Sequence, residues 1–561
     1  ATSTKNHGAV MKKILAATML LLLTGCASLP TRIDIKSGPE LVESDQVDLS
    51  YYTPAGPIAG DSAQGIVSGF LAAGTGPQND YAVAREFLTD SFAQRWSPDS
   101  GVIVRTGAPV FESAGNTLQI VEIGIAARID EHGRYNDSEL GEKTSLRFQL
   151  VLEGGEWRIA SAPNLTVVTP PVFAVVFNAF PIYFLDASGS KLVPDLRWFP
   201  TRASTGTRLV NALLAGPSKW LGEAVTTAVP PSTRLTIEAV NVQQGIALVD
   251  FDGTALEADP LERRLMLSQL RATLLQLSGV SDVAVSINNS AQEIIPADLQ
   301  STNPGGLVYF ESENGIFQVN GTSSTPLSGT TNLLASEGAY DFAVEEGGES
   351  VAIATDQGVY LSQTTGLSNR SVLISDQTDL ASLFFDSWGY LWLVPAAANK
   401  AIEVIGPDRS VRQFEDGATD QRISYSLSPE GIRLATLITG DAGPEVSVHG
   451  LLRDSRGWPV STLGSLRVRN VLGEAIDVIW QQNSTLRVLE RTTSGLTAVS
   501  DYPVTGPRSQ LSMPPTAGTT LATGPSGLST YLLSEVGEIW VLNGSAWRRL
   551  GTNATALSTD G

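Results

Sequence analysis

The stretch Asp386-Ser-Trp-Gly-Tyr-Leu-Trp392 decides the fold of the second half of this 561-residue chain, and Ser428-Pro-Glu-Gly-Ile-Arg-Leu-Ala435 repeats its outline. In both copies a turn around a glycine leads into an apolar strand, as in a β-hairpin. Apolar strand–turn–strand segments of this kind recur after Gly305, at Ser350–Leu361, Ser382–Val394, Ser424–Leu437, Asp477–Glu490 and Thr530–Leu542. Their starts lie 32, 42, 53 and 53 residues apart, near the roughly 40 to 50 residues of a four-stranded propeller blade. We therefore predict a β-propeller of about six blades over residues 300–561, with a pair of β-sandwiches as the alternative.

The preceding stretch, residues 170–290, alternates between strand and helix patterns. The expected strands are Pro181–Leu185, Leu192–Phe199, Arg234–Val242, Gly245–Phe251 and Val283–Ile287, and the expected helices are Thr207–Leu214 and Leu261–Leu277. In the longer helix, leucines at 267, 270, 274 and 277 follow one another at intervals of 3, 4 and 3 residues, which places them on one face. Alternation of this kind predicts an α/β sandwich with helices packed on a mixed sheet.

Residues 51–168 begin with two expected helices, one starting at Asp61 and one running from Asp80 to Trp96. Strands are expected next, at Leu118–Ala126, Leu146–Leu152 and Trp157–Ala160. Two helices followed by a meander of strands predict a small α+β domain with an NTF2-like fold.

The segment from Met11 to Cys26 has the features of an export signal. Lys12 and Lys13 precede an apolar run that is too short to span a bilayer, and Leu23-Thr-Gly-Cys26 closes it. This ending resembles the bacterial lipobox, which implies cleavage between Gly25 and Cys26 and an N-palmitoyl, S-diacylglycerol Cys26. We therefore expect a signal peptide with an upstream extension at 1–25 and a lipidated tether at 26–50. An ordinary signal peptide with a chance cysteine is the alternative.

Composition excludes several classes of function. The net charge of the whole chain is −21, and removal of residues 1–25 takes away Lys5, Lys12 and Lys13 and no acid, which leaves −24. A chain this acidic is not expected to bind nucleic acid or anionic lipid. The lipid on Cys26 is therefore the expected membrane contact. Cys26 is the single cysteine, so no disulfide, cysteine metal site or cysteine nucleophile is expected.

The segment Asp250-Phe-Asp252-Gly-Thr254 resembles the first motif of haloacid-dehalogenase-type phosphatases. In such enzymes the first Asp attacks phosphorus, the second is the general acid/base, and Mg²⁺ balances the charge. That chemistry also needs a downstream lysine, and the chain has only Lys400 after Thr254. We therefore predict a turn after a buried strand at these aspartates, and we keep the phosphatase as an unfavoured alternative.

The remaining polar residues give no catalytic set. His132 and His449 fall in different expected domains, so a histidine triad or multi-histidine metal site is not expected. Asp130-Glu131 and Glu345-Glu346 are interpreted as solvated turns, and a glycosidase pair formed by distant carboxylates stays open. We predict a protein that is not an enzyme and has no cofactor or metal.

Aromatic residues of the expected propeller are interpreted chiefly as core residues between blades. They are Trp388, Tyr390, Trp392, Trp458, Trp480, Trp540 and Trp547. Trp458, in an Arg-Gly-Trp-Pro turn, is the best candidate for an exposed ligand-binding aromatic.

Four further segments carry a resemblance to a known family. They are Leu23-Thr-Gly-Cys-Ala-Ser-Leu-Pro30, Thr169-Pro-Pro-Val-Phe-Ala-Val-Val-Phe177, Val193-Pro-Asp-Leu-Arg-Trp-Phe-Pro200 and Leu209-Val-Asn-Ala-Leu-Leu-Ala-Gly-Pro217. The chain resembles the actinobacterial lipoprotein LpqB family, with a GerMN domain in the middle and the LpqB propeller at the end.

This resemblance implies a lipid-anchored, extracytoplasmic protein of the cell membrane. Its expected partner is the extracytoplasmic part of an MtrB-type sensor kinase, through which it modulates the MtrA response regulator, cell-wall homeostasis and cell division. No catalytic residues carry over. A binder of peptidoglycan or another envelope glycan is the alternative.

Overall fold

The computed structural model describes residues 54–560 except 303, 322, 329, 331–337, 366–370, 441–442, 469–470 and 472. The chain divides into two compact units, Ala1–Thr53 and Pro54–Gly561, and the fold below is that of the second. Gly25, Cys26 and the expected tether lie outside the described residues. Within the described part, no helix is long and apolar enough to cross a membrane. We refer to residues 54–168, 170–300 and 301–560 as the N-terminal, middle and C-terminal modules.

The N-terminal module begins with helix α2 (Ala63–Ala73), which confirms the first expected helix. The Ser62 side chain accepts a hydrogen bond from the Gly65 N–H and so caps its start. The second expected helix is wrong in extent, because only the short helices α3 (Ala82–Arg85) and α4 (Asp90–Ala93) form there. Between them Leu88 makes an isolated bridge to Ile159, and Thr89 begins a new helix as its cap.

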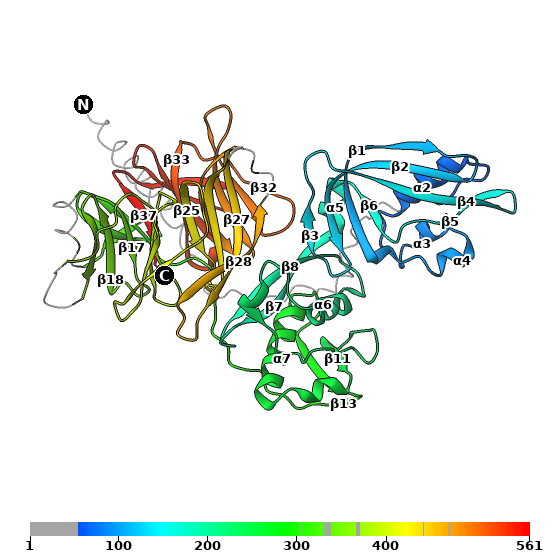
Figure 1. Ribbon diagram of the computed structural model, residues 1–561, viewed down its shortest axis with the longest axis horizontal. Helices are drawn as coiled ribbons and strands as arrows, with labels where there is room; N and C mark the ends of the chain where they lie inside the picture. The colour runs from blue at the N-terminus through cyan, green and yellow to red at the C-terminus, as the bar shows by residue number, and fades with distance from the viewer. Residues whose placement is uncertain are drawn as a thin grey trace, which may run out of the picture. The chain divides into compact units, whose positions relative to one another are not determined.

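A six-stranded sheet completes this module (Figure 1). Its strands are β1 (Gly101–Ser113), β2 (Leu118–Asp130), β3 (Tyr135–Asp137), β4 (Lys143–Glu153), β5 (Glu156–Ser161) and β6 (Thr166–Val168), after the 3₁₀ turn η1 (Pro98–Ser100). The strand order is β5-β4-β2-β1-β6, and β3 pairs with β2. Phe70 and Phe148 meet edge to face at 6.0 Å, so the helices bury their apolar stripe against one face of the sheet.

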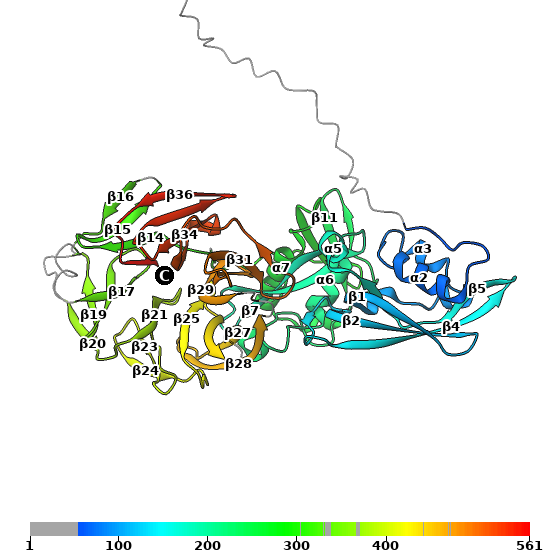
Figure 2. The same ribbon diagram turned by 90° about the horizontal axis from the view of Figure 1, so that it is seen from above.

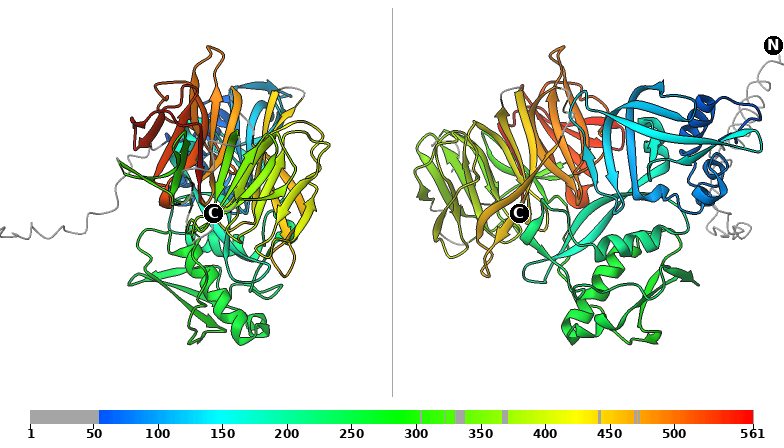
Figure 3. Two further views of the ribbon diagram at one scale, coloured as in Figure 1. Left: turned by 90° about the vertical axis from the view of Figure 1, so that its left-hand side faces the viewer. Right: turned by 45° about the vertical axis from the view of Figure 1, so that its right-hand side comes forward.

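The middle module contains two small sheets with helices packed on them (Figure 3). The first part comprises α5 (Pro170–Val176), β7 (Phe177–Asp186), β8 (Leu192–Pro200), α6 (Thr205–Leu214), η2 (Gly222–Ala224) and β9 (Val225–Thr226). The second part comprises β10 (Asn241–Gln243), β11 (Ile246–Phe251), η3 (Gly253–Glu257), α7 (Pro260–Leu274), β12 (Asp282–Ile287) and β13 (Ser290–Ala291). The sheet orders are β8-β7-β9 and β10-β11-β12-β13, and α7 contacts both β7 and β12. The expected strand at 234–242 is wrong for most of its length, because only β10 and a bridge from Leu235 to Phe251 form.

The C-terminal module contains six four-stranded sheets within the described residues. The first sheet contains β37 (Ala556–Thr559), β14 (Val308–Ser312), β15 (Gly315–Asn320) and β16 (Ser323–Pro326). The second contains β17 (Ala339–Val344), β18 (Ser350–Thr355), β19 (Gly358–Gln363) and β20 (Val372–Ser375). The third contains β21 (Leu380–Phe385), β22 (Leu391–Pro395), β23 (Ile402–Ile405) and β24 (Val411–Phe414). The fourth sheet contains β25 (Arg422–Leu427), β26 (Arg433–Gly440), β27 (Gly443–Arg453) and β28 (Pro459–Val468). The fifth contains β29 (Glu474–Gln482), β30 (Thr485–Arg491), β31 (Thr497–Pro503) and β32 (Ser509–Gln510). The sixth contains β33 (Gly518–Thr523), β34 (Ser529–Ser534), β35 (Ile539–Asn543) and β36 (Ala546–Gly551), with η4 (Pro525–Gly527) between β33 and β34.

The first strands of the six sheets form a closed ring. β37 contacts β17, and contacts continue through β21, β25, β29 and β33 back to β37 (Figure 2). The first sheet combines the start and the end of the module, because β14 pairs with β37. The expected hairpin segments are confirmed, but their spacing is irregular for a simple reason. Some begin at the first strand of a sheet and others, at Ser350 and Thr530, lie at the second strand.

Buried carboxyl groups lie at the seam where the ring closes. Glu311 on β14 is 5% exposed, and burial raises its pKa to about 7. Asp560 follows β37, where its carboxylate accepts the Leu307 N–H at 2.6 Å, and burial raises its pKa to about 6 with the Glu346 carboxylate adding to the effect. Both groups therefore keep their protons to a higher pH in the folded ring than in the unfolded chain.

We predict that the folded protein loses stability as pH rises from 5 to 8. A carboxyl group whose pKa is raised by folding contributes stability below its unfolded value near 4, and this contribution disappears as pH passes its folded value. The loss is on the order of a few kcal/mol, and it is measured as the thermal midpoint of the full chain against pH. Glu311→Gln reduces the loss, whereas Glu313→Gln, on the exposed turn of the same hairpin, leaves it unchanged. A midpoint that is flat or rises with pH would contradict this account.

Candidate functional site

Strand β8 carries the residues that join the three modules. Asp195 and Arg197 form an ion pair at 2.6 Å with both side chains almost fully buried. The Asp195 carboxylate also accepts the Ser218 N–H at 2.7 Å and the Ser218 hydroxyl at 2.9 Å. A buried charge is tolerated when it is paired and hydrogen-bonded, and Asp195 meets both conditions.

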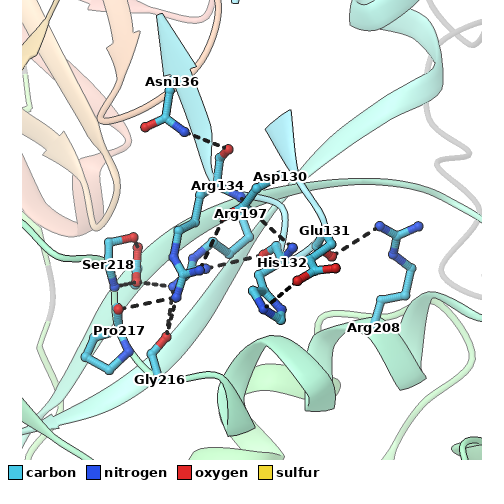
Figure 4. Close-up of polar contacts among 11 residues, drawn as sticks. Asp130, Glu131, His132, Arg134, Asn136, Arg197, Arg208, Gly216, Pro217 and Ser218 are labelled. Carbon is cyan, nitrogen blue, oxygen red and sulfur yellow. Dashed lines mark hydrogen bonds and ion pairs between the residues drawn. The ribbon is translucent and has the colours of Figure 1, made fainter. Parts of the chain in front are cut away.

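A turn of the N-terminal module, residues 130–134, lies against Arg197 (Figure 4). Arg134 donates to the carbonyls of Gly216 and Pro217 at 3.2 and 3.4 Å, just after α6. Arg197 donates to the carbonyls of His132 and Gly216, at 3.3 and 3.2 Å. Both guanidinium groups thus bind the Gly216 carbonyl, which holds the N-terminal and middle modules together through partly buried polar contacts.

Trp198 contacts all three modules. Its backbone N–H donates to the Gly133 carbonyl at 2.8 Å, and its ring lies 5.2 Å from that of Phe173. Its indole Nε1–H donates to the Thr505 carbonyl of the C-terminal module at 2.9 Å. The side chain is only 7% exposed, so one residue joins surfaces that lie more than 300 positions apart in the sequence.

Glycines allow the backbone of the middle module to approach the C-terminal module closely. A Cβ at Gly450 on β27 would lie 2.9 Å from the Trp220 carbonyl oxygen, and one at Gly464 on β28 would lie 3.2 Å from the Trp220 Cα. A Cβ at Gly506, whose φ is +121°, would collide with the Trp198 ring. Apolar residues of the two modules form one continuous buried cluster, which includes Leu221 and Val448. These two modules therefore share a core.

The ring of sheets surrounds an axial channel with a volume of about 980 Å³. Residues of all six first strands line it. Lys191 of the middle module lines one end, where its ammonium group donates to the Ser387 hydroxyl at 3.2 Å and lies 4.7 Å above the Trp388 ring. Lys191 is 5% exposed, and burial lowers its pKa. The middle module thus contributes a wall of the channel.

Five of the six ring-forming first strands have a shift in their pairing register near the start of the strand. A register shift leaves one residue unpaired, and the residue after it is small and polar; these polar residues are Asp341, Ser382, Ser424, Asp477 and Thr520, on β17, β21, β25, β29 and β33. All five line the channel, and we call them the polar belt. A β-bulge redirects the side chain beside it, which explains how a regular strand presents a polar residue at this point.

Three belt residues bind the next sheet in the ring. The Ser382 hydroxyl accepts the Tyr425 N–H at 2.8 Å, and the Ser424 hydroxyl donates to Asp477 at 2.6 Å. Asp477 in turn accepts the Leu521 N–H at 2.7 Å. Burial raises the pKa of Asp477 despite these hydrogen bonds. The belt therefore links neighbouring sheets as well as lining the channel.

Sequence reasoning missed the polar belt. The five segments Tyr-Asp-Phe, Ala-Ser-Leu, Ile-Ser-Tyr, Ile-Asp-Val and Thr-Thr-Leu share only a small polar residue followed by an apolar or aromatic one. Alignment of the five first strands on their register shifts would have revealed this pattern. Sequence reasoning also missed the junction at β8, because the indole and guanidinium groups there bind backbone carbonyls that no local sequence pattern brings together.

The two aspartates of the phosphatase-like segment have structural partners. The Asp250 carboxylate accepts the Ser286 hydroxyl and the Asn289 N–H, the latter at 2.9 Å. Burial acts to raise the pKa of Asp250, but hydrogen bonds from Ser286, Asn289 and Thr236 outweigh it and the pKa is lowered. Asp252 caps η3 by accepting the Thr254 N–H at 3.2 Å. This is the predicted turn after a strand.

The histidines and paired acids do not assemble into one site. His132 lies in the junction turn, where burial lowers its pKa, and Thr436 is the hydrogen-bond partner of His449 on β27. Among the described residues, no group of three or more histidine, cysteine or acidic side chains is arranged to hold a metal ion. Asp130 and Glu131 lie in a turn with exposed side chains, as expected, and Asp130 also accepts the backbone N–H groups of His132 and Arg134.

The expected exposure of Trp458 is wrong. It is 4% exposed, packs edge to face on Tyr390 at 4.7 Å, and lies beneath the Arg412 guanidinium. The interpretation of the other aromatics as core residues holds for Trp392, which is fully buried, and for Trp480. The Arg-Gly-Trp-Pro turn therefore points its ring into the space between two sheets.

These observations define the class of protein, in which a small α/β module is built into the junction between an α+β module and a ring of six β-sheets. Family models match each part: the N-terminal domain of lipoprotein LpqB over residues 56–174, the sporulation and spore germination (GerMN) domain over 181–293, and the LpqB beta-propeller domain over 314–556. The chain belongs to the LpqB lipoprotein family.

Relatives named lipoprotein LpqB come from several actinobacteria. The one from Bifidobacterium longum is 26% identical over 460 residues, which cover 78% of this chain and 78% of the relative. The one from Cutibacterium acnes is 23% identical over 608 aligned positions, covering 98% and 99%. The one from Thermobifida fusca is 26% identical over 485, covering 80% and 76%. Family membership supports an envelope lipoprotein.

We predict that Trp198→Ala loosens the junction of the modules. Truncation of a buried tryptophan typically destabilises a protein by about 3–5 kcal/mol, and here it also leaves the Thr505 carbonyl without its donor. We expect a lower thermal midpoint and faster proteolysis between modules in the full chain. Trp198→Phe keeps most of the apolar contact and loses the hydrogen bond, so it should fall between wild type and Trp198→Ala. Equal resistance of all three proteins to proteolysis would contradict the proposed role of Trp198.

Proposed function

We propose that this protein is a lipid-anchored accessory protein that binds the extracytoplasmic domain of an MtrB-type sensor kinase and so modulates signalling to cell-wall homeostasis and cell division. The observation that supports it best is the sealed junction at β8. Trp198 and Arg197 hold the modules in fixed contact, so surfaces on different modules can be offered to one partner without ordering the chain on binding. Such preorganisation reduces the free-energy cost of association.

The proposal includes the fold of the modules. The closed ring of first strands and the pairing of β14 with β37 support a six-bladed propeller, because a pair of β-sandwiches has no such closure. Helices α2–α4 on one face of a curved meander support an NTF2-like N-terminal module. Cys26 carries the lipid, and residues 26–50 connect it to the N-terminal module.

The outer face of the β11 sheet is the proposed contact with the kinase. Ile246 and Leu248 are 37% and 38% exposed, and they alternate with Ala247 and Val249, which are buried against the module's core. Ala284 lies beside Leu248 on the parallel strand β12 and is also exposed. Adjacent apolar side chains on an open sheet face are typical of a protein-binding patch.

We predict that Ile246→Asp combined with Leu248→Asp weakens kinase binding at least tenfold, because carboxylates on this face would have to be desolvated on association. Binding is measured by calorimetry between the mature chain and the purified kinase ectodomain. Val536→Asp, at a propeller turn with 72% exposure, is the matched control and should bind as wild type does. Absence of binding by the wild type at tens of micromolar, with both partners folded, would refute the proposed function.

We predict that Cys26→Ala releases the protein from the membrane while the thermal midpoint stays unchanged. The acidic body of the chain gives little attraction to anionic lipid, so the lipid supplies the membrane affinity. Fractionation of cells into membrane and soluble parts checks the first point, and thermal unfolding checks the second. A variant that stays with the membrane would show that another feature anchors the chain.

A further inference from the structure

The axial channel contains polar groups that the packing of the sheets leaves available. Ser382, Ser424 and Asp477 are hydrogen-bonded to the next sheet, as described above, and Asp477 also accepts the Val478 N–H at 2.9 Å, so both of its carboxylate oxygens already accept a hydrogen bond. Asp341 differs, because its carboxylate accepts only the N–H of its own neighbour, Phe342, at 2.9 Å within the described part of the chain. Its second oxygen has spare acceptor capacity in a channel of about 980 Å³.

A second unpartnered acid lies behind Asp341. Glu311 is 5% exposed, and its Oε2 is buried without a hydrogen-bond partner among the described residues. Side chains alternate along β14, and Tyr309 packs with Phe342 of the second sheet, so Glu311 is directed toward the same sheet. Glu311 does not line the channel itself, and its carboxyl acts on the channel through Asp341, whose pKa it raises.

The positions of the two belt aspartates specify the shape of the donor. Asp341 is on β17 and Asp477 is on β29, which are three steps apart in a ring of six first strands and therefore face each other across the axis. The acids that line the channel are Asp341, Glu346, Asp386, Asp477 and Asp560, of which Asp386 is paired with the buried Arg453 at 2.7 Å; Lys191 at one end is its one basic lining residue in the described part of the chain. Acidic walls of low dielectric concentrate cations.

We propose that the axial channel binds an aliphatic polyamine, with ammonium groups hydrogen-bonded to Asp341 and Asp477 on opposite walls and the Ser and Thr hydroxyls of the polar belt around the chain between them. The ammonium group of Lys191 lies at one end and repels a cation there, so the ligand binds toward the end where the belt lies. An ammonium group supplies up to three donors, which suits a carboxylate with a free oxygen better than a ligand that offers one donor.

Binding of the polyamine is coupled to the protonation state of Asp341. Burial raises the pKa of Asp341 to about 7, and the nearby carboxyls of Glu311 on β14 and Asp477 on β29 raise it further. The hydrogen bond from the Phe342 N–H acts in the opposite direction. The phenol of Tyr340, the preceding residue, also has a raised pKa. A bound cation favours the ionised carboxylate and therefore displaces its proton. Affinity accordingly increases from pH 6 to pH 8, and binding at pH 6 releases a proton to the buffer.

The test uses spermidine and the full mature chain in detergent, titrated by calorimetry at pH 6 and 8 in buffers of different ionisation enthalpy. We expect one site, roughly tenfold or greater weakening in Asp341→Asn, and loss of the proton release at pH 6 in that variant. Asp356→Asn, on the exposed turn between β18 and β19, should behave as wild type. Thermal unfolding at pH 8 establishes that Asp341→Asn is folded, and it should be no less stable, because the variant lacks a carboxylate that burial disfavours.

Three outcomes would overturn the proposal. One is absence of spermidine binding at millimolar concentration by the folded wild type. Another is equal weakening in the Asp341 and Asp356 variants, which would indicate attraction to the acidic surface as a whole. The third is Mg²⁺ binding that competes fully with spermidine and is lost in Asp341→Asn, which would identify the site as one for a metal ion.

Discussion

The structure depends on the contacts of one indole ring. Trp198 belongs to the middle module, its indole N–H donates to the Thr505 carbonyl of the C-terminal module, and its backbone N–H donates to the Gly133 carbonyl of the N-terminal module. Its neighbour Arg197 adds hydrogen bonds to the Gly216 and His132 carbonyls. Because both residues lie on β8, one short strand fixes the relation between three folded parts.

A second constraint is the closure of the ring. Strand β37 completes the sheet that β14 begins, so the end of the chain is paired with residues some 250 positions earlier. The polar belt also links neighbouring sheets of the ring, since the Ser424 hydroxyl of one sheet donates to the Asp477 carboxylate of the next. The resulting channel is polar, although the spaces between the sheets are apolar, and its walls include Lys191 from another module.

Much of the local structure followed from pattern. The apolar segment Gly245–Phe251 and the leucine spacing around Leu270 predicted a strand and a helix that both form, because such patterns reflect local backbone geometry. The errors lie where a distant contact competes with a local preference. A continuous helix at 80–96 is interrupted because Leu88 bridges to Ile159, and Trp458 is buried because Tyr390 and Arg412 enclose its ring.

The sequence by itself determined the order of the modules, the acidic charge, the hairpin repeat and the turn at Asp252, since each depends on composition or on residues close together in the chain. Only the tertiary structure decided that Asp341 and Asp477 face one channel and that Trp198 meets Thr505. Such placements arise from the sum of long-range packing, in which a register shift of one residue or a glycine at 450 changes which groups meet. No local pattern encodes that sum, because each partner is chosen by the whole fold.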